Sequence, residues 1–400
     1  MQINPRLSLT LFAGILAGGA SLYLYFNNIR KKRQILDNQT QVGSSEQELP
    51  SCVVVDPFST GALLAYDIQL SGFRLVIAYS APMEDLDNLM HMVPGDVKLE
   101  ISDIIPFDPV IENMVTNIRS CCKKLVAIIP GTETGVELAD ILSERMGLLT
   151  NGTRLSYARR NKYLMGETVR KAGLRSVRQS IVKSWEEVED FVRDLNPHPF
   201  QVILKPLDSA GGEDVALCKS IDELRIHFEN IYGKVNGLGY TNIAALVQEY
   251  LEGQEYVVDT VSLHGEHKVV HVMAYDRRQL NGASFVMAGD IVLTSEDDPN
   301  VKNIVEYQKR VITALGIRNG PTHGEVKLCR GEPVLVEVGS RCHGMEGIWR
   351  PVTRAVYGFD QIGCTVVAYL FPERFSEIPS QVHEYNLFSL LLLLIRIFSL

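Results

Sequence analysis

The sequence lacks an excess of basic residues. Its 39 Lys and Arg residues are outnumbered by 48 Asp and Glu residues, which gives a formal net charge of −9 at pH 7. Proteins that bind nucleic acid through its phosphates carry a clustered positive charge. We therefore expect no nucleic-acid partner.

Cysteines spaced as metal ligands are also missing. The seven cysteines are an odd number, and no two of them form a Cys-x-x-Cys pair. This argues against a disulfide scaffold and a cysteine-based zinc site, and favours a reducing compartment. With 46% apolar and 22% charged residues, the composition is that of a globular protein. It excludes a mainly disordered, collagenous or coiled-coil chain.

One long uncharged segment, Leu7 to Phe26, lies close to the N-terminus. As a helix rising 1.5 Å per residue it would reach roughly 30 Å, the thickness of a bilayer core. The basic cluster Arg30 to Arg33 follows it, so the positive-inside rule predicts a single-pass anchor over residues 1–33 with the body of the protein in the cytosol. A cleaved targeting peptide is the open alternative, because small residues crowd the middle of the run.

The segments on either side of the body carry less information. Residues 34–51 are polar without an apolar period and are predicted to be a tether. The apolar tail within residues 376–400, Leu387 to Leu400, is too short to span a membrane by itself. A final core helix and an amphipathic surface segment both remain open for it.

Residues 52–154 show the pattern of a parallel α/β domain. A β-branched run at Val53–Val55 is followed by a small-residue turn, a helical pattern and a second apolar run. A second such unit begins at Leu125–Ile129 and continues into the loop Pro130–Gly135 and a helix. Alternating strands and helices predict a parallel sheet, whose ligands bind at the carboxyl ends of the strands. Neither loop is a G-x-G-x-x-G fingerprint, so we favour a structural domain that lends loops to a shared cleft.

Within residues 155–375, two of the lysines are candidates for a phosphate-binding site. Lys162 lies in a helical pattern, and Lys205 ends a short strand before Pro206. The loop Asp208 to Gly212 then leads to a second strand, which predicts a hairpin with a glycine-bearing tip. Glycine allows backbone N–H groups to approach phosphate oxygens, and lysine adds a point charge. An ordinary hairpin with an exposed lysine is the alternative.

The clearest local signal is a pair of strands around Gly331. Glu325 and Glu337 lie equally far from that glycine, so a symmetric hairpin with a five-residue turn would place them opposite each other. The apolar residues Val326, Leu328, Val334, Val336 and Val338 are expected on the other face. Opposed like charges are destabilising unless a cation lies between them, and oxygen ligands favour Mg²⁺ bound together with phosphates. A register offset that separates the two glutamates is the alternative.

Taken in order, these segments resemble the ATP-grasp superfamily, and most closely its amino-acid ligase branch, which includes carnosine-synthase-like and bacterial dipeptide-ligase-like proteins. The similarity runs from about Cys52 to about Tyr369. It is carried by the order of the motifs Asn161–Met165, Leu204–Pro206 with Ser209–Gly212, Gln248–Glu255, His323–Glu325 and Glu337–Arg341. The implied fold class is α/β, with α+β character in the second half: a predicted transmembrane helix, an N-terminal parallel α/β domain, and then the ATP-grasp domains.

The resemblance also implies roles for individual residues. Lys162 and Lys205 would hold the ATP phosphates, and Arg341 would steady the γ-phosphate and an acyl-phosphate intermediate. Glu325 and Glu337 would bind Mg²⁺, or Mn²⁺ in its place. The remaining ATP-binding residues would be the loop Ser209, Ala210, Gly211 and Gly212, the adenine hinge Glu249, Tyr250 and Leu251, and the ribose contact Glu255.

The substrate pocket is defined only by its position beside the metal hairpin. Candidates on the flanking segments are Arg277, Arg278, His343 and Trp349, each equally compatible with a surface or core role. Gly339 departs from the family pattern, because many relatives have an asparagine there as a further metal ligand.

The implied activity is the ATP- and Mg²⁺-dependent joining of a carboxylate to an amine, with amino acids as the expected substrates. The alternative is a membrane-tethered ATP-binding regulator that no longer catalyses. Carboxylase-like or purine-pathway-like chemistry is a third possibility. The chain has no biotin-attachment motif.

Overall fold

The computed structural model describes residues 49–379 apart from 96, 208–213, 236–240, 281–282 and 294–298. The predicted anchor, the apolar tail and the glycine loop Ser209–Gly212 therefore lie outside the described residues. Within the described part, no helix combines the length and the apolar character needed to cross a bilayer.

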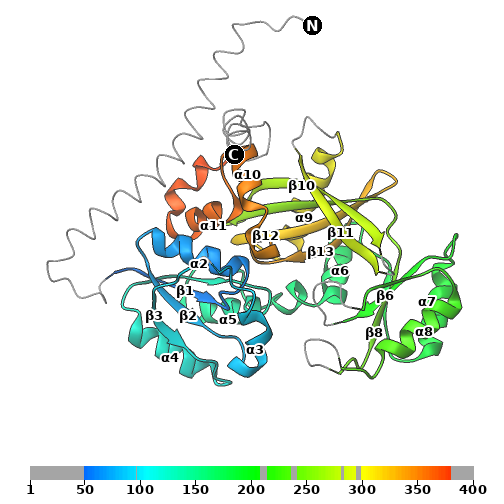
Figure 1. Cartoon of the computed structure of the whole chain (residues 1–400), viewed down its shortest axis with the longest axis horizontal. Helices are drawn as coiled ribbons and strands as arrows, with labels where there is room; N and C mark the ends of the chain where they lie inside the picture. The colour runs from blue at the N-terminus through cyan, green and yellow to red at the C-terminus, as the bar shows by residue number, and fades with distance from the viewer. Residues whose placement is uncertain are drawn as a thin grey trace, which may run out of the picture.

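A parallel sheet forms the first body of the chain (Figure 1). Its strand order is β3-β2-β1-β4, with every neighbouring pair parallel. The strands are β1 (Ser51–Val55), β2 (Arg74–Ala78), β3 (Ile101–Ile105) and β4 (Leu125–Pro130). The connecting helices are α2 (Thr60–Leu70), α3 (Met83–Met90), α4 (Ile111–Cys121) and α5 (Val136–Met146). Strands β1 and β2 are buried along their whole length, as expected for a sheet covered on both faces, and the parallel sheet predicted from the sequence is confirmed.

A small antiparallel sheet follows, with the order β5-β8-β6-β7. Its strands are β5 (Gln179–Val182), β6 (Val202–Pro206), β7 (Ala216–Cys218) and β8 (Ala245–Glu249). Helix α6 (Lys162–Lys171) precedes it, and α7 (Trp185–Leu195) and α8 (Ile221–Ile231) cover it (Figure 1). Leu204 pairs with Ala216, so the predicted hairpin with Lys205 at its base is confirmed.

The larger antiparallel sheet has the order β11-β10-β9-β12-β13. Its strands are β9 (Gln254–Leu263), β10 (Glu266–Leu280), β11 (Ala283–Leu293), β12 (Gly320–Cys329) and β13 (Glu332–Gly339). Helix α9 (Val301–Ala314) packs on one face through residues such as Ile304 and Val311. The chain closes with α10 (Arg350–Tyr357) and α11 (Gln361–Leu370).

Helix α11 lies between the parallel-sheet body and the larger antiparallel sheet, and it is buried on every side. Ile362 and Val366 pack into the core of the parallel-sheet body, whereas Cys364 and Val367 pack against β9. A helix that is apolar all round is one enclosed by protein. Figure 1 shows it between α2 and the larger sheet.

Arg159 holds the connection between the first two bodies in place. Its guanidinium is 1% exposed and lies 2.6 Å from Asp140 Oδ2 on α5. It also donates to the carbonyls of Asn151, Gly152 and Leu315. A buried charge is stable only when it is paired and hydrogen-bonded in this way.

Candidate active site

The β12–β13 hairpin places two carboxylates opposite each other. Glu325 pairs in register with Glu337, as the sequence predicts. The predicted five-residue turn is wrong, because Cys329 pairs with Glu332 and the turn consists of Arg330 and Gly331 alone. Both turn residues have positive φ, at 52° and 85°, as the favoured two-residue hairpin turns require.

A β-bulge at Val336 restores the register that this shorter turn would shift. The pairing passes from Val326 with Leu335 directly to Glu325 with Glu337. One strand of a bulge contributes an extra residue, which changes the face of the residues beyond it. The predicted apolar face is therefore wrong at two positions. Leu335 joins Val326 in the core beneath the sheet, whereas Val334 and Val336 cluster with Leu251.

Two lysines approach these carboxylates from different elements. Lys162 begins α6, whose N-terminus is capped by the Asn161 side chain, and its Nζ lies 3.5 Å from Glu337 Oε2. Lys205 reaches the same place from β6 and is 7% exposed. Burial, with the charge of Lys162 second, lowers the pKa of Lys205 to about 8.

The electrostatics of Glu337 reflect the same convergence. Burial by itself would raise the pKa of this carboxyl group, but Lys162 and Lys205 outweigh burial and lower it. Glu337 is therefore held ionised. Two lysines beside two carboxylates form a site suited to a polyanion bound together with a divalent cation.

The segment between β8 and β9 lies along one side of the hairpin. Lys327 Nζ donates to the carbonyl of Leu251 at 3.2 Å and lies 5.4 Å from the centre of the Tyr250 ring. Gly253 has φ of 149°, and a Cβ there would come within 2.0 Å of the Leu328 carbonyl oxygen. Glu249 points the other way, accepting from the Arg178 amide and pairing with Arg175 at 2.7 Å.

Glu255 and Arg277 form a partly enclosed ionic cluster beside Glu325. Arg277 Nη2 lies 3.0 Å from Glu255 Oε1 and 3.4 Å from Glu325 Oε1. Lys327 lies 3.8 Å from the other Glu255 oxygen. Burial, followed by the charge of Glu325, raises the pKa of Glu255. Of the predicted substrate residues, Arg277 lies within ion-pair distance of a hairpin carboxylate, Glu325.

The other three substrate candidates are placed elsewhere. Arg278 turns to solvent and pairs with Asp276, so the structure does not bring it to the site. His343 and Trp349 are 1% and 2% exposed, and the Trp349 indole donates to the Gly344 carbonyl. Both are buried in the core, so the structure does not bring them to a surface that a substrate could contact.

Arg341 is held by the parallel-sheet body. Its Nε lies 3.1 Å from Glu133 Oε2, on the β4–α5 loop, and Glu133 also pairs with Arg160 at 3.3 Å. The sequence predicts that this loop serves a shared cleft but gives no role to Glu133. A Cβ at Gly339 would come 2.8 Å from Glu133 Oε2. The ion pair between Arg341 and Glu133 therefore lies directly beside Gly339, the position at which many family members have an asparagine.

The start of α2 fixes the loop that follows Arg341. Thr60 Oγ1 donates to the Gly344 carbonyl at 2.9 Å, and the Glu346 amide donates to Ser59 Oγ at 3.0 Å. Ser59 has φ of 48°, an uncommon value for a residue other than glycine. Two bodies of the protein therefore build one site.

His323 is a functional candidate that the sequence motif contained without a role. Its Nε2 lies 3.5 Å from Glu325 Oε1, and its Nδ1 lies 2.9 Å from Asp259 Oδ1. Burial alone would lower the pKa of His323, but Asp259 outweighs it and raises the pKa to about 9. The imidazolium therefore bridges Asp259 and a predicted metal carboxylate.

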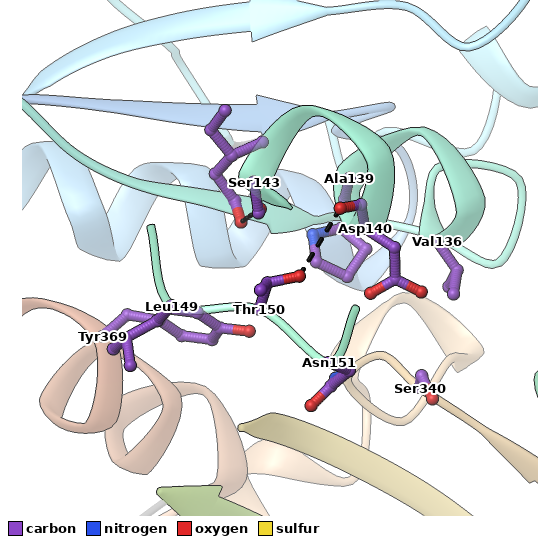
Figure 2. Close-up of a pocket in the computed structure, with 11 residues that line it drawn as sticks. Val136, Ala139, Asp140, Ser143, Leu149, Thr150, Asn151, Ser340 and Tyr369 are labelled. Atoms are coloured by element: carbon purple, nitrogen blue, oxygen red, sulfur yellow. Dashed lines mark hydrogen bonds between the residues drawn. The ribbon is translucent and has the colours of Figure 1, made fainter. Parts of the chain in front are cut away.

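A separate small pocket lies between α5 and the loop after it (Figure 2). Asp140, Thr150, Ser340 and Tyr369 are among its lining residues, and Thr150 donates to the Asp140 carbonyl at 3.4 Å. Its empty volume of about 290 Å³ includes space open to solvent. Ligand pockets usually enclose about 300–1,000 Å³. Neither the lysines nor the paired glutamates line it, so we do not assign the nucleotide to it.

Comparison with known proteins agrees with this arrangement. Residues 198–347 match the model of the ATP-grasp domain. Dapdiamide A synthase from Enterobacter agglomerans is 30% identical over 338 residues, which cover 84% of this chain and 76% of that protein. The chain belongs to the ATP-grasp family. It is an ATP-dependent, ADP-forming ligase.

Further members of the family share the fold or part of the sequence. The L-arginine-specific L-amino acid ligase of Bacillus subtilis is 27% identical over 54% of this chain and 51% of its own length. The crystal structure of L-amino acid ligase from Bacillus licheniformis superimposes with a TM-score of 0.60, at 16% identity, over 82% of this chain and 75% of that one. An ADP complex of N5-carboxyaminoimidazole ribonucleotide synthetase gives 0.61 at 14% identity, over 84% and 79%.

Proposed function

We propose that this ATP-grasp protein joins the carboxylate of one amino acid to the amine of another substrate through an acyl phosphate. The observation that carries the proposal is the facing pair Glu325 and Glu337 with Lys162 and Lys205 beside it. Similar proteins of Bacillus subtilis include an L-arginine-specific L-amino acid ligase and an alanine–anticapsin ligase.

The donor atoms suit Mg²⁺. Glu325 and Glu337 offer only carboxylate oxygens, and like charges in register would repel each other without a cation between them. These two residues would hold the ion. When bound, Mg²⁺ supplies charge neutralisation for the phosphates.

Each residue of the site then has a defined task. Lys162 and Lys205 bind the phosphates of ATP, and the half-buried Tyr250, next to Leu251, offers a surface for the adenine. The substrate carboxylate attacks the γ-phosphorus, forming the acyl phosphate while ADP leaves. The amine then attacks the acyl carbon, and inorganic phosphate leaves as the amide forms. Arg341 stabilises the charge on the transferred group, so catalysis is positioning and electrostatics.

The test is ADP release by the protein with ATP, Mg²⁺ and pooled amino acids, with product masses measured in the same samples. We expect amino-acid-dependent ADP release and a new amide mass. Glu337→Gln should abolish both. The control Glu306→Gln, an exposed residue of α9 with an ion pair to Lys309, should retain them. ADP release without an amide product would overturn the substrate assignment.

We also propose that residues 1–33 anchor the protein in a membrane with its body in the cytosol, on the basis of the uncharged run and its basic flank. Fractionation of cells expressing the full chain and a chain lacking residues 1–48 tests this proposal. The full chain should sediment with membranes until detergent is added. Recovery of both chains in the soluble fraction would contradict it.

A further inference from the structure

A row of buried imidazoles surrounds Asp259 behind the proposed nucleotide site. Asp259 on β9 pairs in register with His271 on β10 and with His323 on β12, so the three side chains are neighbours across the sheet. His343, from the loop after β13, packs against His323 and contacts Asp259. Its ring centre lies 4.0 Å from that of His323.

Two of the imidazoles converge on one carboxylate oxygen. His271 Nε2 lies 2.5 Å and His343 Nδ1 lies 3.0 Å from Asp259 Oδ2. The donor atoms of these three residues all lie within 4.8 Å of one another. Asp259 and His271 are 0% exposed, and His343 is 1% exposed.

His271 is only partly satisfied by its neighbours. Its Nε2 is paired with Asp259 Oδ2, whereas its buried Nδ1 has no hydrogen-bond partner among the described residues. A buried imidazole nitrogen without a partner is costly, because its desolvation is not repaid.

The surrounding contacts resemble the outer shell of a metal site. His323 Nδ1 occupies the other oxygen of Asp259 at 2.9 Å, and Tyr275 Oη lies 3.2 Å from His343 Nε2. The His343 amide donates to Gln361 Oε1 at 2.7 Å. Such partners orient ligands and raise their affinity.

We propose that Asp259, His271 and His343 bind one divalent transition-metal ion of the zinc class. Two nitrogens and one oxygen favour Zn²⁺ or Co²⁺ over Mg²⁺, which prefers oxygen ligands alone. Because the three residues are sealed from solvent, the ion serves structure. It ties β9 and β10 to the loop that follows Arg341.

The experiment is metal analysis of the full chain expressed in zinc- or cobalt-supplemented medium and then desalted. We expect one equivalent of Zn²⁺ per chain, and visible absorption bands of Co²⁺ bound to nitrogen ligands in the cobalt protein. His271→Gln and His343→Gln should each lose this metal and its spectrum. His267→Gln, on the same strand as His271, should keep both.

Further variants separate this site from the catalytic one and from misfolding. Glu337→Gln should retain the full equivalent, because it alters only the proposed Mg²⁺ site. Asp259→Asn, nearly identical in shape, should lower the affinity for Co²⁺ at least tenfold. A wild-type protein without the metal would overturn the proposal, as would undiminished metal in both histidine variants. In that case the cluster is a metal-free network around Asp259.

Discussion

Lys205 shows how burial adjusts a single residue for its task. A lysine with a pKa of about 8 is only partly charged in weakly alkaline solution, whereas an exposed lysine stays charged. The phosphates of a nucleotide would restore the charge. In the free protein, Lys205 can lose its proton, which lowers the free-energy cost of burying the side chain. Bound phosphates then favour the charged ammonium form.

Nucleotide affinity should therefore depend on pH through Lys205. Below pH 8 the lysine is charged and affinity is flat. Above pH 8 binding must take up a proton, so affinity falls by nearly tenfold per pH unit. Calorimetry with ADP from pH 7.5 to 9.5 measures this, and Lys205→Arg, which stays charged, should give a weaker but flat profile. A flat wild-type profile would contradict the assignment.

Gly339 is the second residue with a specific consequence. Asparagine there would press its Cβ to 2.8 Å from Glu133 Oε2 and 3.0 Å from Arg341 Cζ. We expect Gly339→Asn to displace this ion pair and to lower kcat at least tenfold, with no gain in Mg²⁺ affinity. Gly289→Asn is the control, because a Cβ at Gly289 meets nothing within 4 Å. Unchanged kcat with tighter Mg²⁺ binding would refute this explanation of the glycine.

At the scale of elements, α10 is joined to α2 and to the start of α11 by a buried ionic network. Arg350 contacts Asp67 on α2 and lies 3.1 Å from Asp360 Oδ2. Asp360 also caps α11 by accepting from the Gly363 amide at 2.8 Å. Burial alone would raise the pKa of Asp360, but Arg350 and Arg354 outweigh it and lower the pKa to about 2.

Removing the shared guanidinium should be costly. Arg350→Met leaves two buried carboxylates with only the more exposed Arg354 as a shared partner, and we expect a loss of about 3–5 kcal/mol in the free energy of unfolding. Urea denaturation measures it. Arg193→Met removes an exposed pair with Asp190 and should change stability by less than about 1 kcal/mol. Equal effects of the two substitutions would show that the network adds nothing.

The helices and strands also show which features could be predicted from the sequence and which could not. The opposed glutamates could be predicted because hairpin pairing is local. The two-residue turn at Arg330 and the bulge at Val336 could not be predicted. The turn shifts the strand register by one residue and the bulge shifts it back, so Glu325 and Glu337 face each other just as they would across a regular hairpin with a longer turn. The pairing of Arg341 with Glu133 was equally out of reach, because one sequence carries no record of contacts between distant segments. The cluster around Asp259 was missed for the same reason.

At the scale of the whole molecule, all seven cysteines are free and none is exposed. Their thiols lie in several separate cores, so each reports on a different part of the fold. Burial raises the pKa of Cys218 and of Cys342 to about 12, and the charge of a nearby carboxylate adds to burial at Cys218. Few thiolates are then present at neutral pH.

The native protein should react slowly with Ellman's reagent. We expect Cys121 and Cys329, the two half-buried cysteines, to react first, and the remaining five only after global unfolding. All seven should react within the mixing time in guanidinium chloride. Rapid modification of Cys52 or Cys364 in native buffer would mean that the cores open far more often than their packing indicates.

The contacts of Ser59 and Thr60 with residues 344–346 set a rule for building chimaeras from this family. Exchanging the N-terminal α/β domain between two ligases would also exchange the support of the arginine loop. A hybrid should keep its turnover only if residues 339–347 are transplanted together with the β1–α2 loop and Glu133. Cutting at the apparent domain border would separate parts that work as one, so recombination in this family should favour crossovers that keep these segments from a single parent.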